Sequence, residues 1–267
     1  MFKNKFTTYT ILFLIVAVHL LLDVLYNSRS ILWLLLSILI YILIVIRGVF
    51  DIRRDFFFKS IHKTMGFRLK YENGEIKYIP QKQIALTFDD GPHPILTPKF
   101  LDFLHKEKIQ ATFFVIGKNA EKHPEILERI IKEGHSIGLH SWNHQNHGPF
   151  QKTQDQIEEY QNLQEFLKEK IHYKTKLARP PFGITNPRIM KAFESLELQS
   201  IGWSIRSLDT KSNAEQISKR VIKNLKKPNQ IILLHDTQEQ SLEALESIVR
   251  HVKEKNWEFS NLEYFNS

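Results

Sequence analysis

The chain has 267 residues, enough for one soluble domain of usual size plus a further segment. It contains no cysteine, which excludes disulfide bonds, thiolate metal ligands and cysteine nucleophiles, so any metal must be held by His, Asp or Glu. A formal net charge of +8 favours an anionic partner such as a membrane surface, whereas the lysines lack the interleaved aromatics that would indicate nucleic acid as a partner.

Two apolar runs open the chain. They cover residues 9–26 and 31–46 and are separated only by the polar residues 27–30. Each run is near the length of about 20 residues with which a helix crosses a bilayer. We therefore expect residues 1–50 to form a membrane anchor of two transmembrane helices in contact with membrane lipids. A cleaved signal peptide is the alternative for the first run, but no small-residue cleavage pattern follows it.

Basic residues flank this anchor unequally. Lys3 and Lys5 precede the first run, Arg29 alone lies between the runs, and a cluster follows the second run: Arg47, Arg53, Arg54, Lys59 and Lys63. The positive-inside rule then puts both ends of the hairpin in the cytoplasm. We expect a multi-pass protein of the cell membrane, and we leave the side of the following domain open because a cytoplasmic domain could not reach a polymeric wall glycan.

Residues 51–81 are expected to form a connector with a hairpin turn at Asn73-Gly74. The main domain then covers residues 82–267. Apolar runs of β type, at residues 84–88, 111–116, 136–139, 177–179, 199–203 and 231–234, alternate with helical patterns near residues 97–104, 123–134, 155–170, 187–196, 213–225 and 241–255. This alternation predicts an α/β fold with a parallel sheet, either a barrel or an open doubly wound sheet.

Ionisable residues directly follow most of these runs. In parallel α/β folds the carboxyl ends of the strands form one rim, where ligands bind. Any one of these residues alone is more often structural: an Asp-Asp-Gly-Pro turn, a solvent-exposed arginine or a hydrogen-bonded histidine. Together on one rim they indicate a functional site, and they are Asp89, Asp90, His140, His144, Arg179, Asp209, His235 and Asp236.

The residue types on this rim fit metal-assisted hydrolysis. Two imidazoles and one carboxylate leave a coordination position open for water, as in catalytic zinc sites. The side chains of Asp89 and Asp90 diverge, so one carboxylate can bind the metal while the other serves as a general base. His235 is a candidate general acid, provided that a carboxylate such as Asp209 raises its pKa.

These residues resemble the motifs of the NodB-homology polysaccharide deacetylases, carbohydrate esterase family four. The resemblance covers roughly residues 84–265. Five motifs occur in the family's order: Thr87-Phe-Asp-Asp-Gly-Pro-His93, His140-Ser-Trp-Asn-His144, Arg179-Pro-Pro-Phe-Gly183, the segment from Trp203 to Asp209, and Leu233-Leu-His-Asp236.

The resemblance implies a distorted (β/α) barrel and a role for each motif. Asp89 would be the catalytic base, oriented by Arg179, and His235 the general acid, tuned by Asp209. The metal ligands would be Asp90, His140 and His144, with zinc expected first and cobalt, nickel or manganese as other candidates. Residues on the substrate side would be Phe182, whose backbone N–H would contact the oxyanion, together with Trp203 and Leu233.

Three positions depart from the family pattern. Phe182 replaces the usual tyrosine, which costs only a hydroxyl if the oxyanion contact is made by the backbone. Thr210 stands where a tryptophan is common, so the acetyl pocket is expected to be less aromatic. Arg206 stands where a second acidic residue is common, which would favour an anionic group on the substrate.

The expected function is removal of N-acetyl groups from the amino sugars of a polysaccharide, with an N-acetylated glycan as substrate. Two alternatives remain. The first is a deformylase or deacetylase of a lipid-linked sugar at the membrane face. The second is a non-enzymatic, membrane-bound module that binds glycans.

Overall fold

A curled parallel sheet forms the centre of the protein. The computed structural model describes residues 14, 17–18, 21–22, 31–72 and 75–263. The strands lie in the order β7-β6-β5-β4-β3-β9-β8, with β10 beside β3, and every pairing in this sheet is parallel. Their bounds are β3 (Gln83–Asp89), β4 (Thr112–Val115), β5 (Ser136–Leu139), β6 (Leu177–Ala178), β7 (Gln199–Ser200), β8 (Ile205–Arg206), β9 (Gln230–His235) and β10 (Glu258–Phe259).

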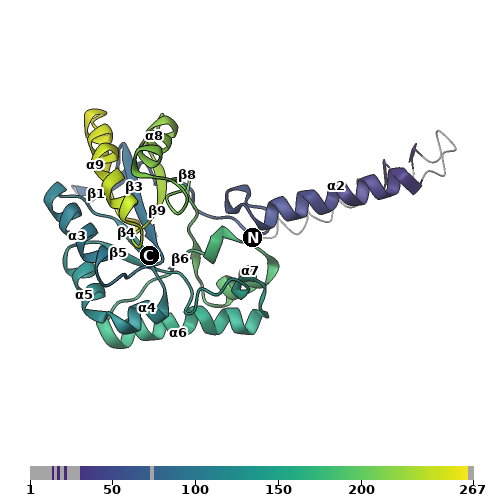
Figure 1. The fold of residues 1–267 in the computed structure, drawn as a ribbon, viewed down its shortest axis with the longest axis horizontal. Coiled ribbons are helices and arrows are strands. Elements are labelled where there is room, and N and C mark those ends of the chain that lie inside the picture. Colours follow the sequence, from purple (N-terminus) through teal and green to yellow (C-terminus); the bar gives the residue numbers. More distant parts are fainter. Residues whose placement is uncertain (1–13, 15–16, 19–20, 23–30, 73–74, 264–267) are drawn as a thin grey trace.

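Helices cover the outer face of this sheet (Figure 1). They are α3 (Leu96–Glu107), α4 (Gly117–Lys122), α5 (Pro124–Lys132), α6 (Thr153–Ile171), α7 (Pro187–Ser195), α8 (Ala214–Asn224) and α9 (Glu239–Glu254). Short 3₁₀ turns add η1 (Ile52–Arg54), η2 (Gly148–Phe150) and η3 (Pro181–Gly183). The predicted helices are thus confirmed, whereas α4, β8 and β10 were not predicted, because no apolar run or helical periodicity marks these short segments.

Alternating side chains of the central strands serve two different cores. Ile84, Leu86 and Phe88 of β3 pack among the helices in the larger core. Ala85 belongs to a second core inside the curl of the sheet, which also contains Phe114, Leu177, Ile201, Trp203, Ile231 and Leu233. This alternation continues to the ends of the strands. Every second side chain near the carboxyl ends therefore points to the concave side of the sheet.

The sheet curls without closing. Strands β7 and β8 lie at its two ends, and the residues between these strands connect one end to the other. The Ile201 N–H donates to the carbonyl of Ala178 in β6 at 2.8 Å, and the Ser204 N–H donates to the carbonyl of Ile231 in β9 at 3.0 Å. The expected α/β class and parallel sheet are confirmed, and the predicted barrel is an open one.

The segment predicted as a connector contributes to the domain. Ile52 is 1% exposed and packs into the inner core. Ile61 pairs with Ile201 beside the open end of the sheet: its N–H donates to the Ser200 carbonyl at 2.8 Å, and its carbonyl accepts from the Gly202 N–H at 2.8 Å. Residues 52–61 therefore lie along the open seam, the place between β7 and β8 where the sheet does not close.

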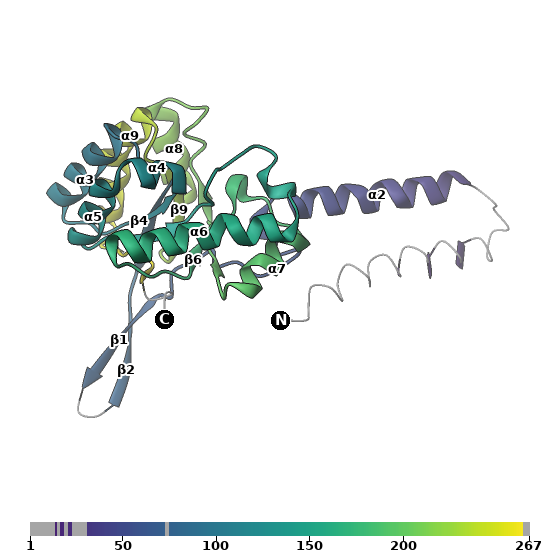
Figure 2. The same cartoon turned by 90° about the horizontal axis from the view of Figure 1, so that it is seen from below.

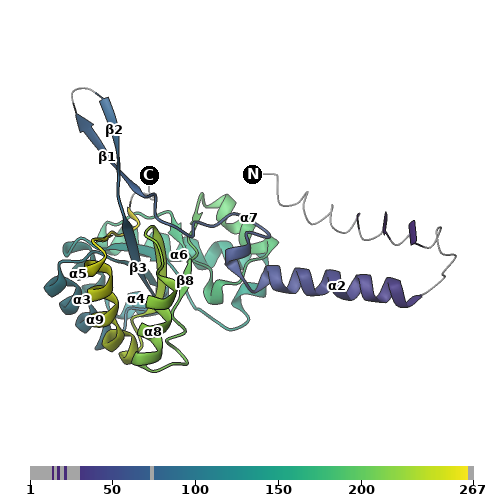
Figure 3. The ribbon, with the colours of Figure 1, turned by 90° about the horizontal axis from the view of Figure 1, so that it is seen from above.

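The predicted hairpin forms beyond this segment. Strands β1 (Phe67–Glu72) and β2 (Glu75–Pro80) pair antiparallel, and Figures 2 and 3 show this hairpin projecting away from the sheet and its helices. The turn residues Asn73 and Gly74 lie outside the described residues. Because β2 leads directly into the start of β3, the hairpin projects from the end of the sheet opposite the carboxyl rim.

The second apolar run forms helix α2 (Ile31–Val49), which extends away from the domain in Figure 1. Its last residues contact the domain: Thr185 donates from its N–H to the Val49 carbonyl at 2.9 Å and from its hydroxyl to the Gly48 carbonyl at 3.1 Å. Within the described ranges, no helix has the length and hydropathy needed to cross a membrane. Most of the first apolar run lies outside those ranges, so the predicted transmembrane hairpin stays a prediction.

Candidate active site

Neighbouring strands bring Asp89 and His235 together. The two residues are direct partners in the parallel register of β3 and β9, and both occupy inner positions at the carboxyl ends of their strands. The residues below them on the same face, Thr87 and Leu233, are fully or almost fully buried. The rim predicted from the sequence is thus formed over the inner core, at the mouth of the curl.

Arg179 fixes the Asp89 carboxylate from below. Its guanidinium is 0% exposed, lies 4.1 Å from the centre of the Phe114 ring, and donates to Asp89 Oδ1 at 2.6 Å and to the Thr87 hydroxyl at 2.9 Å. The remaining donors reach the carbonyls of Ile201 at 3.1 Å and Gly202 at 3.0 Å. A buried charge is tolerated only when it is paired and hydrogen-bonded, and here both conditions are met. The geometry fits the predicted role of Arg179 in orienting Asp89.

The predicted metal ligands converge on one point. One donor atom each of Asp90, His140 and His144 lies within 4.8 Å of the others. The Nε2 atoms of His140 and His144 lie 3.5 and 3.3 Å from Asp90 Oδ1. Within the described part of the chain, Asp90 Oδ1 is buried and has no hydrogen-bond partner, which is costly for a carboxylate oxygen unless a cation balances it. The three residues therefore fit a divalent metal ion.

The two adjacent aspartates have different partners although both face His140. Asp90 has a left-handed backbone with φ of 74°, and its Oδ1 lies 3.5 Å from His140 Nε2, which is 3.8 Å from Asp89 Oδ2. The Nδ1 atom of His140 lies 2.8 Å from the Arg179 carbonyl, which can only accept, so Nδ1 carries the proton and Nε2 is free to bind metal. Burial, followed by the charge of His144, lowers the pKa of His140 to about 3 and keeps this imidazole neutral.

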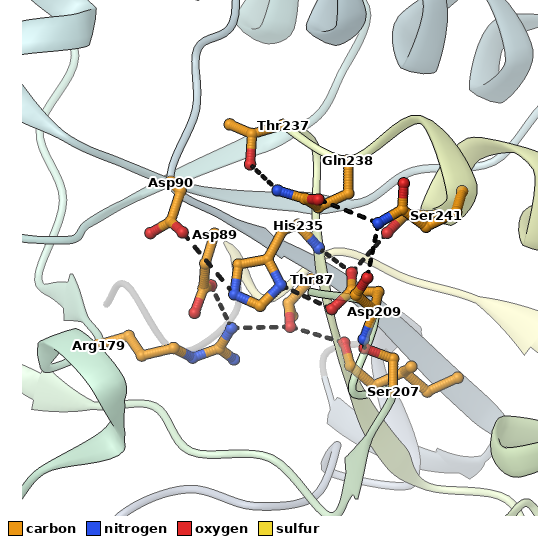
Figure 4. A network of polar contacts seen from close by, with 12 residues as sticks. Thr87, Asp89, Asp90, Arg179, Ser207, Asp209, His235, Thr237, Gln238 and Ser241 are labelled. Atoms are coloured by element: carbon orange, nitrogen blue, oxygen red, sulfur yellow. Dashed lines mark hydrogen bonds and ion pairs between the residues drawn. The ribbon is translucent and has the colours of Figure 1, made fainter. Parts of the chain in front are cut away.

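His235 is bound on its other side by Asp209 (Figure 4). Its Nδ1–H donates to Asp209 Oδ1 at 2.8 Å, and its backbone N–H donates to Oδ2 at 2.7 Å. The Ser241 hydroxyl also donates to Oδ2, at 2.5 Å. Burial lowers the pKa of His235, but the hydrogen bond and the charge of Asp209 outweigh it and raise the pKa to about 9. The imidazole is therefore a cation near neutral pH, with Nε2 facing Asp90 Oδ2 at 3.8 Å.

The Asp89 carboxyl has the environment of a base. Burial raises its pKa above the ordinary value, and the nearby charges of Arg179 and His235 oppose that shift. For Asp209 the balance is reversed: burial raises its pKa, but the hydrogen bond and charge of His235 lower it below the usual range. The pKa values of two carboxylates on one rim are thus shifted in opposite directions. This is the usual difference between a proton acceptor and a carboxylate that stays ionised as a counter-ion.

The three residues predicted on the substrate side occupy different depths. Phe182 is 42% exposed at the mouth, has a left-handed backbone with φ of 60°, and places its ring 4.7 Å from that of His144. Trp203 is buried beside Gly183, where an added Cβ would lie 2.3 Å from the indole. Leu233 lies in the inner core. Phe182 is thus the one among them that lies at the surface of the site.

The motifs did not indicate several residues that complete the site. Thr87 contacts Arg179, Ser241 contacts Asp209, and Glu159 of α6 contacts the loop between the two histidine ligands. Thr87 lies inside the first motif, but its inward position became meaningful only with the register of β3. Ser241 and Glu159 lie on helices outside the motifs, and no local signal identifies them as residues of the site.

Comparisons with known proteins identify the family to which this chain belongs. A family model described as polysaccharide deacetylase matches residues 77–201. Two peptidoglycan-N-acetylglucosamine deacetylases of Bacillus cereus are 36% and 34% identical over 189 residues, 67% of this chain, which correspond to 66% and 85% of their own lengths. The chain thus spans just under two thirds of the first of these relatives.

A solved structure gives the same result for the fold. The peptidoglycan deacetylase PdaC of Bacillus subtilis is 31% identical, with a TM-score of 0.64 over 69% of this chain and 89% of that one. The resemblance noted in the sequence is confirmed: this chain belongs to the polysaccharide deacetylase family.

Proposed function

We propose that this protein is a metal-dependent hydrolase that removes N-acetyl groups from the amino sugars of a glycan, with peptidoglycan as the favoured substrate. The observation that carries the proposal is the arrangement of Asp89 and His235 as register partners beside the group formed by Asp90, His140 and His144. A base and an acid thereby flank one metal position. The names of the similar Bacillus deacetylases support peptidoglycan as the substrate class.

The chain's own residues divide the proton transfers. Asp89, held by Arg179, accepts a proton from the water that attacks the acetamide carbonyl. His235, held as a cation by Asp209, donates its Nε2 proton to the departing nitrogen when the carbon–nitrogen bond breaks. The products are acetate and a free amino sugar. The backbone N–H of Phe182 is assigned to the developing oxyanion.

Asp90, His140 and His144 would hold the metal. Zinc is the first choice for a site of two imidazoles and one carboxylate, although cobalt, nickel or manganese accept the same ligands. When bound, such an ion supplies Lewis acidity toward the carbonyl and lowers the pKa of a coordinated water.

Acetate release from peptidoglycan and from N-acetylglucosamine oligomers by the full chain tests this proposal. We expect activity that a chelator abolishes and that added zinc restores. A protein that binds these glycans, does not release acetate with any of the four metals, and binds equally well as the Asp89→Asn variant would instead be the non-enzymatic glycan-binding module.

We also propose that the protein resides in the cell membrane through residues 1–50, with lipids as partners. Support comes from the apolar composition of the two N-terminal runs and from the exposed leucine and isoleucine side chains along α2, such as Leu35, Leu39 and Leu43. A lipid-linked sugar is the second candidate substrate, favoured by the hydrogen bonds between the end of α2 and Thr185 on the loop that follows η3.

A reporter fused after Ser267 tests the side of the membrane on which the domain lies. The positive-inside bias predicts activity of a reporter that works only in the cytosol. Activity of a reporter that works only outside the cell would contradict that bias and would favour polymeric peptidoglycan over a lipid-linked precursor.

A further inference from the structure

The loop between the two histidine ligands has an unfavourable backbone. Ser141 and His144 both adopt left-handed conformations, with φ of 64° and 50°, although neither is glycine. Such conformations are unfavourable for residues other than glycine and persist only where surrounding contacts hold them. In this conformation of the loop His144 Nε2 lies 3.3 Å from Asp90 Oδ1, so the contacts that hold the loop also hold the ligand.

One carboxylate holds the middle of this loop. Glu159 Oε2 accepts from the backbone N–H of Trp142 at 2.9 Å and from that of Asn143 at 2.8 Å. Glu159 Oε1 accepts from the side-chain amide of Asn143. Hydrogen bonds to an ionised acceptor are roughly twice as strong as neutral ones. A single side chain thus binds three donors between His140 and His144.

Further contacts surround this clamp. The carbonyls of Ser141 and Trp142 accept from the first N–H groups of α4, on Gly117 and Lys118, both at 3.0 Å. The Trp142 ring packs against Phe166, which lies on the same helix as Glu159, at 6.0 Å between ring centres. The loop is therefore held from one side by α4 and from the other by α6, and Glu159 supplies its only contacts to an ionised group among the hydrogen bonds of the described residues.

We infer that Glu159 is a positioning residue for the metal site: it acts through the backbone of Trp142 and Asn143 to hold His144 in ligating geometry. Glu159 lies outside every motif, and among the described residues its hydrogen bonds go to Trp142 and Asn143. Partners that orient metal ligands typically contribute about 10- to 100-fold to metal affinity. The inference rests on the proposed metal site.

Zinc affinity of the full chain tests this role, with zinc alone as the probe. We expect Glu159→Ala to weaken zinc binding by about 10- to 100-fold. Glu159→Gln preserves length and one acceptor but turns N–H groups toward Asn143, so we expect an intermediate loss. Glu158→Ala is the matched control, because Glu158 is exposed on the same helix and, among the described residues, accepts a hydrogen bond only from Gln154, at 3.3 Å.

The outcomes separate this inference from the proposed function. A wild-type chain that does not bind zinc would overturn the metal site itself. A wild-type chain that binds zinc, with both Glu159 variants binding it equally well, would overturn only the role of Glu159. The role of Glu159 would also be overturned if the variants lower the melting temperature of the metal-free protein but leave the zinc dissociation constant unchanged. Should Glu159→Ala fail to fold, Glu159→Gln decides the question.

Discussion

His235 and Asp209 illustrate how the chemistry depends on single residues. Both carboxylate oxygens of Asp209 are engaged by His235, one through the ring and one through the backbone. The side chain of Asp209 is 0% exposed, so its charge acts on the imidazole without screening by water. Burial lowers the pKa of His235, but the hydrogen bond and charge of Asp209, together with the charges of Asp89 and Asp90, raise it to about 9.

Replacing Asp209 by Asn should shift the basic limb of the pH dependence of kcat, the range in which kcat falls as pH rises. In the proposed mechanism His235 acts as the acid in its protonated form, so activity should fall as pH rises through its pKa of about 9. Without the carboxylate charge, burial lowers that pKa, and the basic limb should shift to lower pH. Acetate release between pH 6 and about 10 measures the shift.

Ser241→Ala is the matched comparison, because it removes one hydrogen bond to Asp209 Oδ2 and leaves the charge in place. We expect a much smaller shift in this variant. A basic limb that does not move in Asp209→Asn would show that His235 is not the titrating acid.

At the scale of elements, short irregular segments set the geometry of the site. The η3 turn places Phe182 beside His144, and it does so with two successive left-handed residues, Phe182 at φ of 60° and Gly183 at φ of 68°. The indole of Trp203 packs directly on Gly183. A side chain at residue 183 would therefore collide with this indole unless the turn shifted.

Gly183→Ala should displace this turn. Its Cβ would lie 2.3 Å from the Trp203 ring, so the backbone that carries Phe182 must shift. A misplacement near 1 Å in a catalytic group typically costs about 100-fold, and we expect a loss of kcat of that order. The measurement is kcat for acetate release.

Gly148→Ala is the control glycine, because the nearest atom to its added Cβ is 3.9 Å away. Its activity should match that of the wild type. Equal activity of the two variants would contradict a positioning role for η3.

The sequence predicted most of the sheet and nearly all residues on the rim, because strand ends in a parallel sheet converge whatever the exact topology. It did not predict the open seam, the two-residue strand β8 or the packing of residues 52–61, since these depend on contacts between segments far apart in sequence. Glu159 and Ser241 were not predicted for the same reason. Their helices are recognisable, but the side that faces a motif loop is decided only by the assembled fold.

At the scale of the whole molecule, residues that precede strand β3 contribute to the core of the domain. Ile52 packs into the inner core, and Ile61 bonds both neighbours of Ile201, whose own carbonyl accepts from Arg179. The segment that lines the seam is thereby connected to the residue that orients Asp89. A boundary at Lys82, as expected from the apolar runs, would leave this segment out.

A chain that begins at Asp51 should therefore be more stable than one that begins at Lys82. The shorter chain loses the Ile52 side chain from the core and the hydrogen bonds of Ile61 to residues 200 and 202. Melting temperature measures the difference. Within the longer chain, Ile52→Ala should lower the free energy of unfolding by about 2–5 kcal/mol.

Ile79→Ala is the control, since Ile79 is 38% exposed on the projecting hairpin. Its effect should stay below about 0.5 kcal/mol. Equal melting temperatures for the two truncated chains would show that residues 51–81 are only a link.

The central claim is that two adjacent aspartates have different tasks, Asp89 as base and Asp90 as metal ligand. The most direct measurement is the zinc dissociation constant and the rate of acetate release for Asp89→Asn and Asp90→Asn side by side. Asp89→Asn should retain zinc and lose about 10²- to 10⁴-fold in kcat, the usual contribution of a general base. Asp90→Asn should lose zinc affinity and activity together. An active Asp89→Asn variant, or an Asp90→Asn variant that binds zinc like the wild type, would contradict the account.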